Sequence, residues 1–235
     1  MTIKYHNDIL QGTEEWFAIR RGLLTASEMK NIITPKKLEI VKDPTHLYEL
    51  AAQRVSGFVE PTFVSNDMLR GKEDEIIARA LYNEHYAPVT ECGFITNDRW
   101  GFTLGYSPDW LVSDEGQAEC KSQCQKYHFE SIGAAELDPE FRIQIQTGLL
   151  VSERSFCDFV SFCGGLPMWT KKILPDLELQ EKIVAAAFAA EEKIKAHIER
   201  YNEAMSAQYG RFIPTERRIT SNGMIVGDTD VKEAA

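Results

Sequence analysis

The stretch that decides the fold runs Ser107-Pro108-Asp109-Trp110-Leu111-Val112-Ser113-Asp114-Glu115-Gly116-Gln117-Ala118-Glu119-Cys120-Lys121. An apolar run, a polar turn that ends in glycine and a second short run predict a β-hairpin. The hairpin brings Asp109 and Glu119 close together. Because residues two apart on a strand point to the same face, Glu119 and Lys121 share one face while Cys120 points toward a core. The sequence therefore predicts two carboxylates and one ammonium group on a narrow patch.

This patch has the chemistry of a metal-dependent hydrolytic site. Two facing carboxylates repel each other, and a bound cation removes that cost. Hard oxygen ligands with open positions suit Mg²⁺ or Mn²⁺. A lysine beside the metal, here Lys121, can hold or activate a water, or stabilise charge growing on a phosphate. The alternative is an ordinary hairpin with a surface ion pair, since Pro-Asp turns and Glu-x-Lys strands are each common.

Composition narrows the class of protein. The chain has 235 residues, 43% of them hydrophobic, which is enough for one domain with a substantial core. No apolar run reaches the about eighteen residues of a membrane span, and the N-terminus lacks the layout of a signal peptide, so we expect a cytoplasmic protein. Five cysteines without a Cys-x-x-Cys pair indicate neither a disulfide framework nor a zinc ribbon. A net charge of −10 argues against a nonspecific nucleic-acid coat protein but allows a nuclease with a local positive groove.

A second group of candidate residues precedes the hairpin in the chain. Thr13 is expected to cap a helix that ends at Gly22, and Thr25 or Ser27 then opens a second short helix. Hydroxyls and free backbone N–H groups at a helix start, with Arg20 nearby, make an anion site. A plain pair of capped helices with surface arginines is the alternative.

The strongest helix prediction covers residues 67–86. Its apolar residues at helical spacing predict a buried stripe made of Ile76, Ile77, Ala80 and Leu81. Glu75 lies next to that stripe and can point inward at a polar site. A flanking surface carboxylate is the alternative interpretation of Glu75.

The remaining pattern predicts an α/β protein. Further helices are expected over residues 45–56, 139–151 and 176–209, with short strands at 89–90, 92–95, 102–106, 155–163 and 169–173. The segment after Lys121 is expected to be a polar linker. We expect a single domain over residues 1–210 and a C-terminal tail over 211–235 that is weakly ordered or docked on a neighbouring subunit.

Taken in order, the motifs resemble those of a known family. They are Trp16 with Arg20-x-Gly22, Thr25-Ala26-Ser27-Glu28, Gly71-Lys72-x-x-Glu75, Ser107-Pro108-Asp109, Glu119-x-Lys121 and Gln144-x-Gln146. This series resembles the lambda-exonuclease-like, or YqaJ-type, phage recombination nucleases of the PD-(D/E)xK superfamily. The resemblance runs from about Glu14 to Phe162, and the loop at residues 34–44 departs from the family pattern.

The resemblance implies a restriction-endonuclease-like core, in which helices flank a mixed central β-sheet. It implies a homotrimeric ring that digests one strand of duplex DNA from the 5′ end with Mg²⁺, for which Mn²⁺ can substitute. Asp109, Glu119 and Glu75 fall on the metal carboxylates, and Lys121 falls on the catalytic lysine. The other matched positions are Gln144, on the glutamine of the helix after the active-site strand, and Arg20 and Ser27, in the 5′-phosphate pocket.

The function expected from this resemblance is a 5′→3′ exonuclease for double-stranded DNA ends. It would release 5′-mononucleotides and leave 3′ overhangs for a phage single-strand annealing protein, in the cytoplasm of a bacterial host. An endonuclease or junction resolvase on the same core is one alternative, and a catalytically dead DNA-end-binding scaffold is another. The intact set of Asp109, Glu119 and Lys121 argues against the scaffold.

Overall fold

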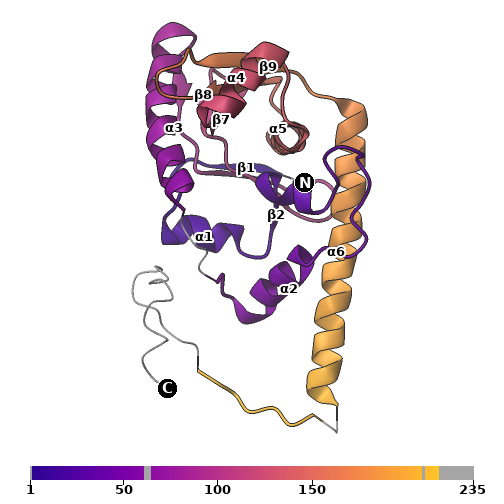
Figure 1. The fold of residues 1–235 in the computed structure, drawn as a ribbon. Helices are drawn as coiled ribbons and strands as arrows, with labels where there is room; N and C mark the ends of the chain where they lie inside the picture. The colour runs from indigo at the N-terminus through magenta and orange to yellow at the C-terminus, as the bar shows by residue number, and fades with distance from the viewer. Residues whose placement is uncertain (1, 61–64, 208–209, 217–235) are drawn as a thin grey trace.

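The computed structural model describes residues 2–60, 65–207 and 210–216, whose strands form two mixed sheets (Figure 1). The four-stranded sheet has the order β1 (Ile3–His6), β4 (Phe94–Asn97), β5 (Leu104–Tyr106) and β2 (Leu24–Thr25), with only β2 and β5 parallel. The five-stranded sheet has the order β3 (Val89–Thr90), β6 (Trp110–Val112), β7 (Gly116–Ser122), β8 (Phe156–Phe162) and β9 (Trp169–Ile173). Only β7 and β8 are parallel there. The expected α/β class with mixed strands is confirmed, with the strands divided between two sheets.

The predicted hairpin is β6 and β7, paired antiparallel with Trp110 opposite Ala118. Strand alternation sorts the residues of β7 between two sides of the sheet. Ala118 and Cys120 pack into the apolar cluster under α3, which also contains Trp110. Glu119 and Lys121 therefore face the opposite side, as the sequence predicts.

Helices cover both faces of the five-stranded sheet. On one face lies α3 (Asn66–His85), and on the other lies α5 (Pro139–Ser152), whose Ile145 and Leu149 pack on Cys157 and Phe159 of β8. Asp138 caps α5 and Pro139 opens it, which is the helix start that the sequence predicts. Helix α5 also contacts β4 and β5, so it joins the two sheets.

The N-terminal and C-terminal helices meet along the side of the molecule. Helix α6 (Leu177–Ser206) is the long helix of Figure 1, and it packs against α2 (His46–Ser56) and α5. Upstream of α2 lie α1 (Glu14–Arg20), capped by Thr13, and the 3₁₀ helix η1 (Ala26–Asn31). Residues 217–235 of the expected C-terminal tail lie outside the described residues. No helix in the described part of the chain is long and apolar enough to cross a membrane.

Two expectations about elements are wrong. The segment after Lys121 is not a linker but contains α4 (Gln125–Ala134), held by the buried His128, which bonds to Ser161 and the carbonyl of Pro167. The predicted stripe of α3 is also largely wrong, because Ile76 is 61% exposed and Ile77 51% exposed, although Leu81 packs against the core as expected. The face of α3 that is buried carries Ala78 and Tyr82 instead.

Candidate active site

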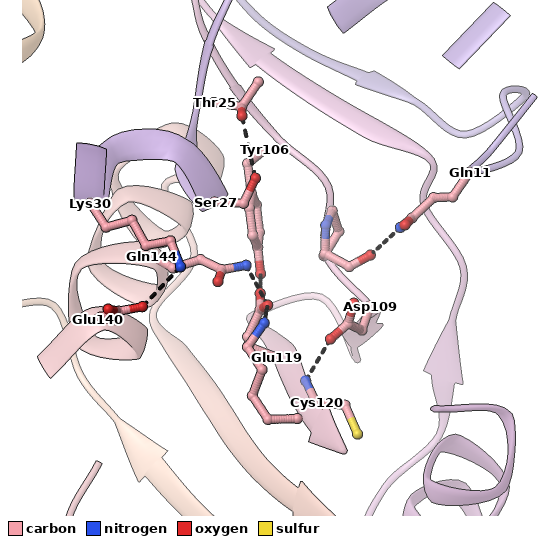
Figure 2. Close-up of polar contacts among 12 residues, drawn as sticks. Gln11, Thr25, Ser27, Lys30, Tyr106, Asp109, Glu119, Cys120, Glu140 and Gln144 are labelled. Atoms are coloured by element: carbon pink, nitrogen blue, oxygen red, sulfur yellow. Dashed lines mark hydrogen bonds and ion pairs between the residues drawn. The ribbon is translucent and has the colours of Figure 1, made fainter. Parts of the chain in front are cut away.

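Glu119 lies at the centre of the candidate site and is only 1% exposed. Its Oε1 accepts hydrogen bonds from Lys121 Nζ, at 2.7 Å, and from Gln144 Nε2 of α5. Its Oε2 accepts a bond of 3.3 Å from the hydroxyl of Tyr106, which ends β5. Figure 2 shows Gln144 and Tyr106 converging on this carboxylate from different elements. One buried carboxylate thus joins β5, β7 and α5.

Asp109 lies beside Glu119 at the open end of the hairpin (Figure 2). Its Oδ2 accepts a hydrogen bond of 2.5 Å from the backbone N–H of Cys120, and its own N–H donates to the carbonyl of Ala118. The preceding Pro108 is held from the N-terminal segment, since Gln11 Nε2 donates to its carbonyl at 2.8 Å. The backbone of the partner strand therefore fixes the orientation of the Asp109 carboxylate.

The site carries more negative charge than its lysine neutralises. Burial, followed by the charges of Glu119 and Glu75, raises the pKa of Asp109 well above its usual range. Burial by itself would lower the pKa of Lys121, but Glu119 and Asp109 outweigh burial and raise it. Carboxylates that disfavour each other's ionisation in this way gain stability from a cation between them.

Glu75 lies on the partly buried side of α3 and interacts with this group through charge. Burial raises its pKa, Arg79 opposes the shift, and the charge of Glu119 adds to it, so Glu75 lies within electrostatic range of Glu119. Asp74 accepts a bond of 2.6 Å from Ser122 Oγ at the end of β7. This contact ties α3 to the strand that carries Glu119 and Lys121.

The donor chemistry fits a hard divalent cation, because Asp109 and Glu119 supply carboxylate oxygens and Glu75 adds nearby negative charge. Within the described ranges, no group of three or more His, Cys, Asp or Glu side chains is close enough to hold a metal ion. The structure brings Glu119, Lys121 and Gln144 together by contact, whereas Asp109 and Glu75 interact with this group through charge.

Arg20 and Ser27 belong to a neighbouring cluster of polar side chains, the Arg20 pocket, which shares Ser107 with the Ser107-Pro108-Asp109 motif. Arg20 donates to Ser107 Oγ at 3.3 Å and to Thr25 Oγ1 at 3.4 Å. Thr25 Oγ1 lies 3.4 Å from Ser27 Oγ (Figure 2). The guanidinium group stacks 4.2 Å above the ring of Trp16, whose Nε1 also donates to Ser107 Oγ. Because Ser107 is two residues from Asp109, this pocket adjoins the carboxylates.

Two contributors to the site were missed by sequence reasoning. Tyr106 and Ser107 directly precede the Pro-Asp pair, and this position in the sequence is the feature that could have identified them as part of the site. The tyrosine can lie flat on α5 because residue 148 is glycine, where a Cβ atom would lie 2.7 Å from the Tyr106 ring. The role of Ser107 depends on Arg20 and Trp16, which are far away in the chain.

Fold and site together define a class of nucleases, in which two neighbouring strands of a mixed sheet present two acidic residues and a lysine: Asp109 directly before β6, and Glu119 and Lys121 on β7. The chain belongs to the YqaJ-like viral recombinase domain family, whose model matches residues 15–155.

Solved structures agree with this assignment. The alkaline exonuclease LHK-Exo from Laribacter hongkongensis is 33% identical, with a TM-score of 0.73, and the match covers 83% of this chain and 98% of that one. The structure of LHK-Exo in complex with dAMP gives 34% identity, the same coverage and a TM-score of 0.75. A phage-related exonuclease from Haemophilus somnus 129PT, 15% identical over 78% of this chain and 98% of its own, has a TM-score of 0.56 and shows the fold alone. The restriction-endonuclease-like fold is thereby confirmed. The comparison with curated proteins finds no match.

Proposed function

We propose that the protein is a metal-dependent exonuclease that digests one strand of duplex DNA in the 5′→3′ direction. The observation that carries the proposal is the junction at Ser107-Pro108-Asp109, where the Arg20 pocket meets the buried carboxylates. A pocket for a terminal phosphate beside a hydrolytic site is what an exonuclease requires. The complex of LHK-Exo with dAMP, a deoxynucleoside monophosphate, supports a mononucleotide product.

Asp109 and Glu119 are the residues that would hold Mg²⁺, or Mn²⁺ in its place, and Glu75 adds negative charge near them. The ion would supply positive charge to the phosphate oxygens and an activated water. Titration calorimetry with Mn²⁺ tests this assignment. The Asp109→Asn variant should lose the binding heat that the wild type gives, and an unchanged isotherm would remove Asp109 from the ligand set.

The chain's own residues have separate tasks in the cleavage. Gln144 and Tyr106 fix the Glu119 carboxylate. Lys121, ion-paired to Glu119 at 2.7 Å, stabilises the negative charge that grows on the attacked phosphate. Water adds to phosphorus, and the bond to the 3′ oxygen of the terminal nucleotide breaks, which releases a 5′-mononucleotide and leaves a 5′-phosphate on the next one.

The new 5′-phosphate is the group that the Arg20 pocket suits. A terminal phosphate carries more charge than an internal one, and Arg20 offers a planar fork of donors for its oxygens. The hydroxyls of Ser27 and Ser107 line the same pocket. Attraction into the pocket advances the strand by one nucleotide after each cut.

Linear duplex DNA with a label at either the 5′ or the 3′ end, with Mg²⁺, tests polarity. We expect early release of the 5′ label as a mononucleotide, retention of the complementary strand, and no release with a chelator. Cleavage of closed circular DNA would favour an endonuclease or junction resolvase instead. Binding of duplex ends without release of any nucleotide would favour the scaffold.

The 5′-phosphate pocket is tested by comparing 5′-phosphoryl with 5′-hydroxyl duplex. Wild-type digestion should start faster on the phosphorylated end, and Arg20→Ala should shrink that difference. Equal wild-type rates on both ends would rule the pocket out. A homotrimer and a phage single-strand annealing protein as partner, in the cytoplasm of a bacterial host, complete the proposal and derive from the family resemblance.

A further inference from the structure

The turn that follows Arg20 is held by α2, and α2 is in turn held by a residue of α6, which lies beyond the family match that ends at residue 155. Arg20 is the last residue of α1, and Gly22 follows in a left-handed conformation with φ of +69°. The turn closes through a bond of 3.0 Å from the N–H of Leu23 to the carbonyl of Arg20. The conformation of this turn sets the position of the Arg20 backbone, and with it the direction in which the Arg20 side chain extends.

Both backbone polar groups of Gly22 are bound by side chains of α2. Its N–H donates to Gln53 Oε1 at 2.8 Å, and its carbonyl accepts from Arg54 Nε at 2.8 Å. The fit is close, because a Cβ atom on residue 22 would lie 2.6 Å from Arg54 Cγ. The two side chains therefore hold the turn in one position against α2.

Arg54 is itself fixed from α6. Its two terminal nitrogens each donate to one oxygen of Glu191 at 2.7 Å, which is the bidentate geometry of strong ion pairs. Glu191 is 6% exposed, whereas the Arg54 side chain is 27% exposed, so the pair is partly shielded from water. A buried carboxylate of this kind needs a reason to be retained, since an apolar pair of similar volume is often as stable or more so.

We propose that Gln53, Arg54 and Glu191 are positioning residues for the Arg20 pocket, and that they set the preference of the enzyme for 5′-phosphoryl ends. The proposal rests on the function proposed above. It assigns a role in substrate selection to α6, which carries none of the motifs of the family. These residues do not contact the phosphate; they act by holding the Gly22 turn.

Glu191→Gln is the first test, because it keeps the shape but removes the charge that binds both nitrogens of Arg54. The readout is the ratio of kcat/KM on 5′-phosphoryl duplex to that on 5′-hydroxyl duplex. We expect this ratio to fall by about tenfold or more, since a displacement of about 1 Å far from the reacting atoms can cost on the order of 10²-fold. The rate on 5′-hydroxyl duplex should stay near the wild-type value.

Glu192→Gln is the matched control, with the same substitution one residue along α6. Glu192 pairs with Lys195 on the surface, and its loss should leave the ratio unchanged. A second pair of variants, both at Gln53, tests the same role if Glu191→Gln does not fold. Gln53→Glu keeps the oxygen that accepts from Gly22 and should keep the preference, whereas Gln53→Met removes it and should lose the preference.

The outcomes separate this inference from the proposed function. If Arg20→Ala lowers the ratio while folded Glu191→Gln and Gln53→Met keep it, the positioning role is wrong and the phosphate pocket stands. If the wild type does not distinguish the two ends, the pocket and the positioning role fall together. A general loss of rate on both ends, with the ratio kept, would mean that the ion pair only stabilises the fold.

Discussion

Each carboxylate of the site has a different set of donors. Glu119 accepts from Lys121, Gln144 and Tyr106, whereas Asp109 accepts from the backbone N–H of Cys120. The three bonds hold Glu119 in one orientation, and its burial makes its interactions with charge strong. We therefore expect Lys121 to be the residue whose removal separates catalysis from binding.

Lys121→Ala should lower the single-turnover cleavage rate by about 10²–10³-fold, the usual loss for one preorganised charge in a site of this kind. Duplex binding and Mn²⁺ binding should change little, because the ammonium group is not a metal ligand. Quench-flow cleavage and a fluorescence binding assay measure the two effects. Lys171→Ala on β9 is the matched control, since Lys171 bonds to the carbonyl of Ala135. Turnover near the wild-type rate in Lys121→Ala would contradict the role.

His46 gives the fold a pH dependence that can be measured. Burial lowers its pKa, but an ion pair with Glu28, at 3.7 Å, and a hydrogen bond with Glu49, at 2.8 Å, outweigh burial and raise the pKa above 6.5. A raised pKa means that the stabilisation is fully present below pH 6.5 and is lost as the pH rises through the folded-state pKa. His46→Gln should therefore reduce the free energy of unfolding more in mildly acidic than in alkaline buffer.

Urea unfolding at several pH values measures this difference between the wild type and His46→Gln. The same substitution at His85, an exposed residue at the end of α3, is the matched control. A destabilisation by His46→Gln that grows with pH would show the opposite sign and refute the assignment.

At the scale of elements, the site depends on how closely α5 approaches β5. Gly148 lies against the Tyr106 ring, and the ring delivers its hydroxyl to Glu119. Any side chain at position 148 separates these two elements. The Glu119 carboxylate is thus coupled to the packing of a helix and a strand from different parts of the chain.

Gly148→Ala should destabilise the protein by about 1–3 kcal/mol, because overpacking of a filled core forces side chains or backbone to shift. It should also reduce cleavage, since the Tyr106 hydroxyl moves away from Glu119. Thermal unfolding and single-turnover rates measure both effects. Gly133→Ala in α4 is the control: its added Cβ atom meets nothing within 4 Å, and alanine favours a helix over glycine by about 0.5–1 kcal/mol. Equal effects at the two positions would rule out the Tyr106 contact.

At the scale of the whole molecule, the pocket and the carboxylates are assembled from both ends of the chain. Trp16 and Arg20 come from the N-terminal helix, Ser107 and Asp109 from the hairpin, and Glu191 from α6. The family model ends at residue 155 and so omits α6, which carries the Glu191 partner of Arg54. Truncation before α6 would remove that support.

The trimer remains a prediction from the family resemblance. Light scattering should give a mass three times the 26.7 kDa of one chain. A ring that encloses its substrate stays attached over many cuts, so the processivity of digestion should be lost if the ring opens. A monomer mass at micromolar concentration, together with full processive activity, would contradict the prediction.

The sequence by itself determined the β6–β7 hairpin, the helix starts at Thr13 and Asp138, and the shared face of Glu119 and Lys121. These features are local, because turn residues, caps and the period of two act within a few residues. The same local rules explain why the sequence predicts that the hairpin brings Asp109, Glu119 and Lys121 close together.

Only the tertiary structure decided which side of α3 is buried and what holds the Arg20 turn. Ile76 and Ile77 have the helical spacing of a core stripe, yet Ala78 and Tyr82 are the residues that pack against the sheet. The Tyr82 hydroxyl also bonds to the buried Asp158. Helical spacing is satisfied by more than one face, and the choice depends on the shape of the opposing sheet. Likewise, the contact of Arg54 with Glu191 spans 137 residues, and no local pattern encodes a pairing at that distance.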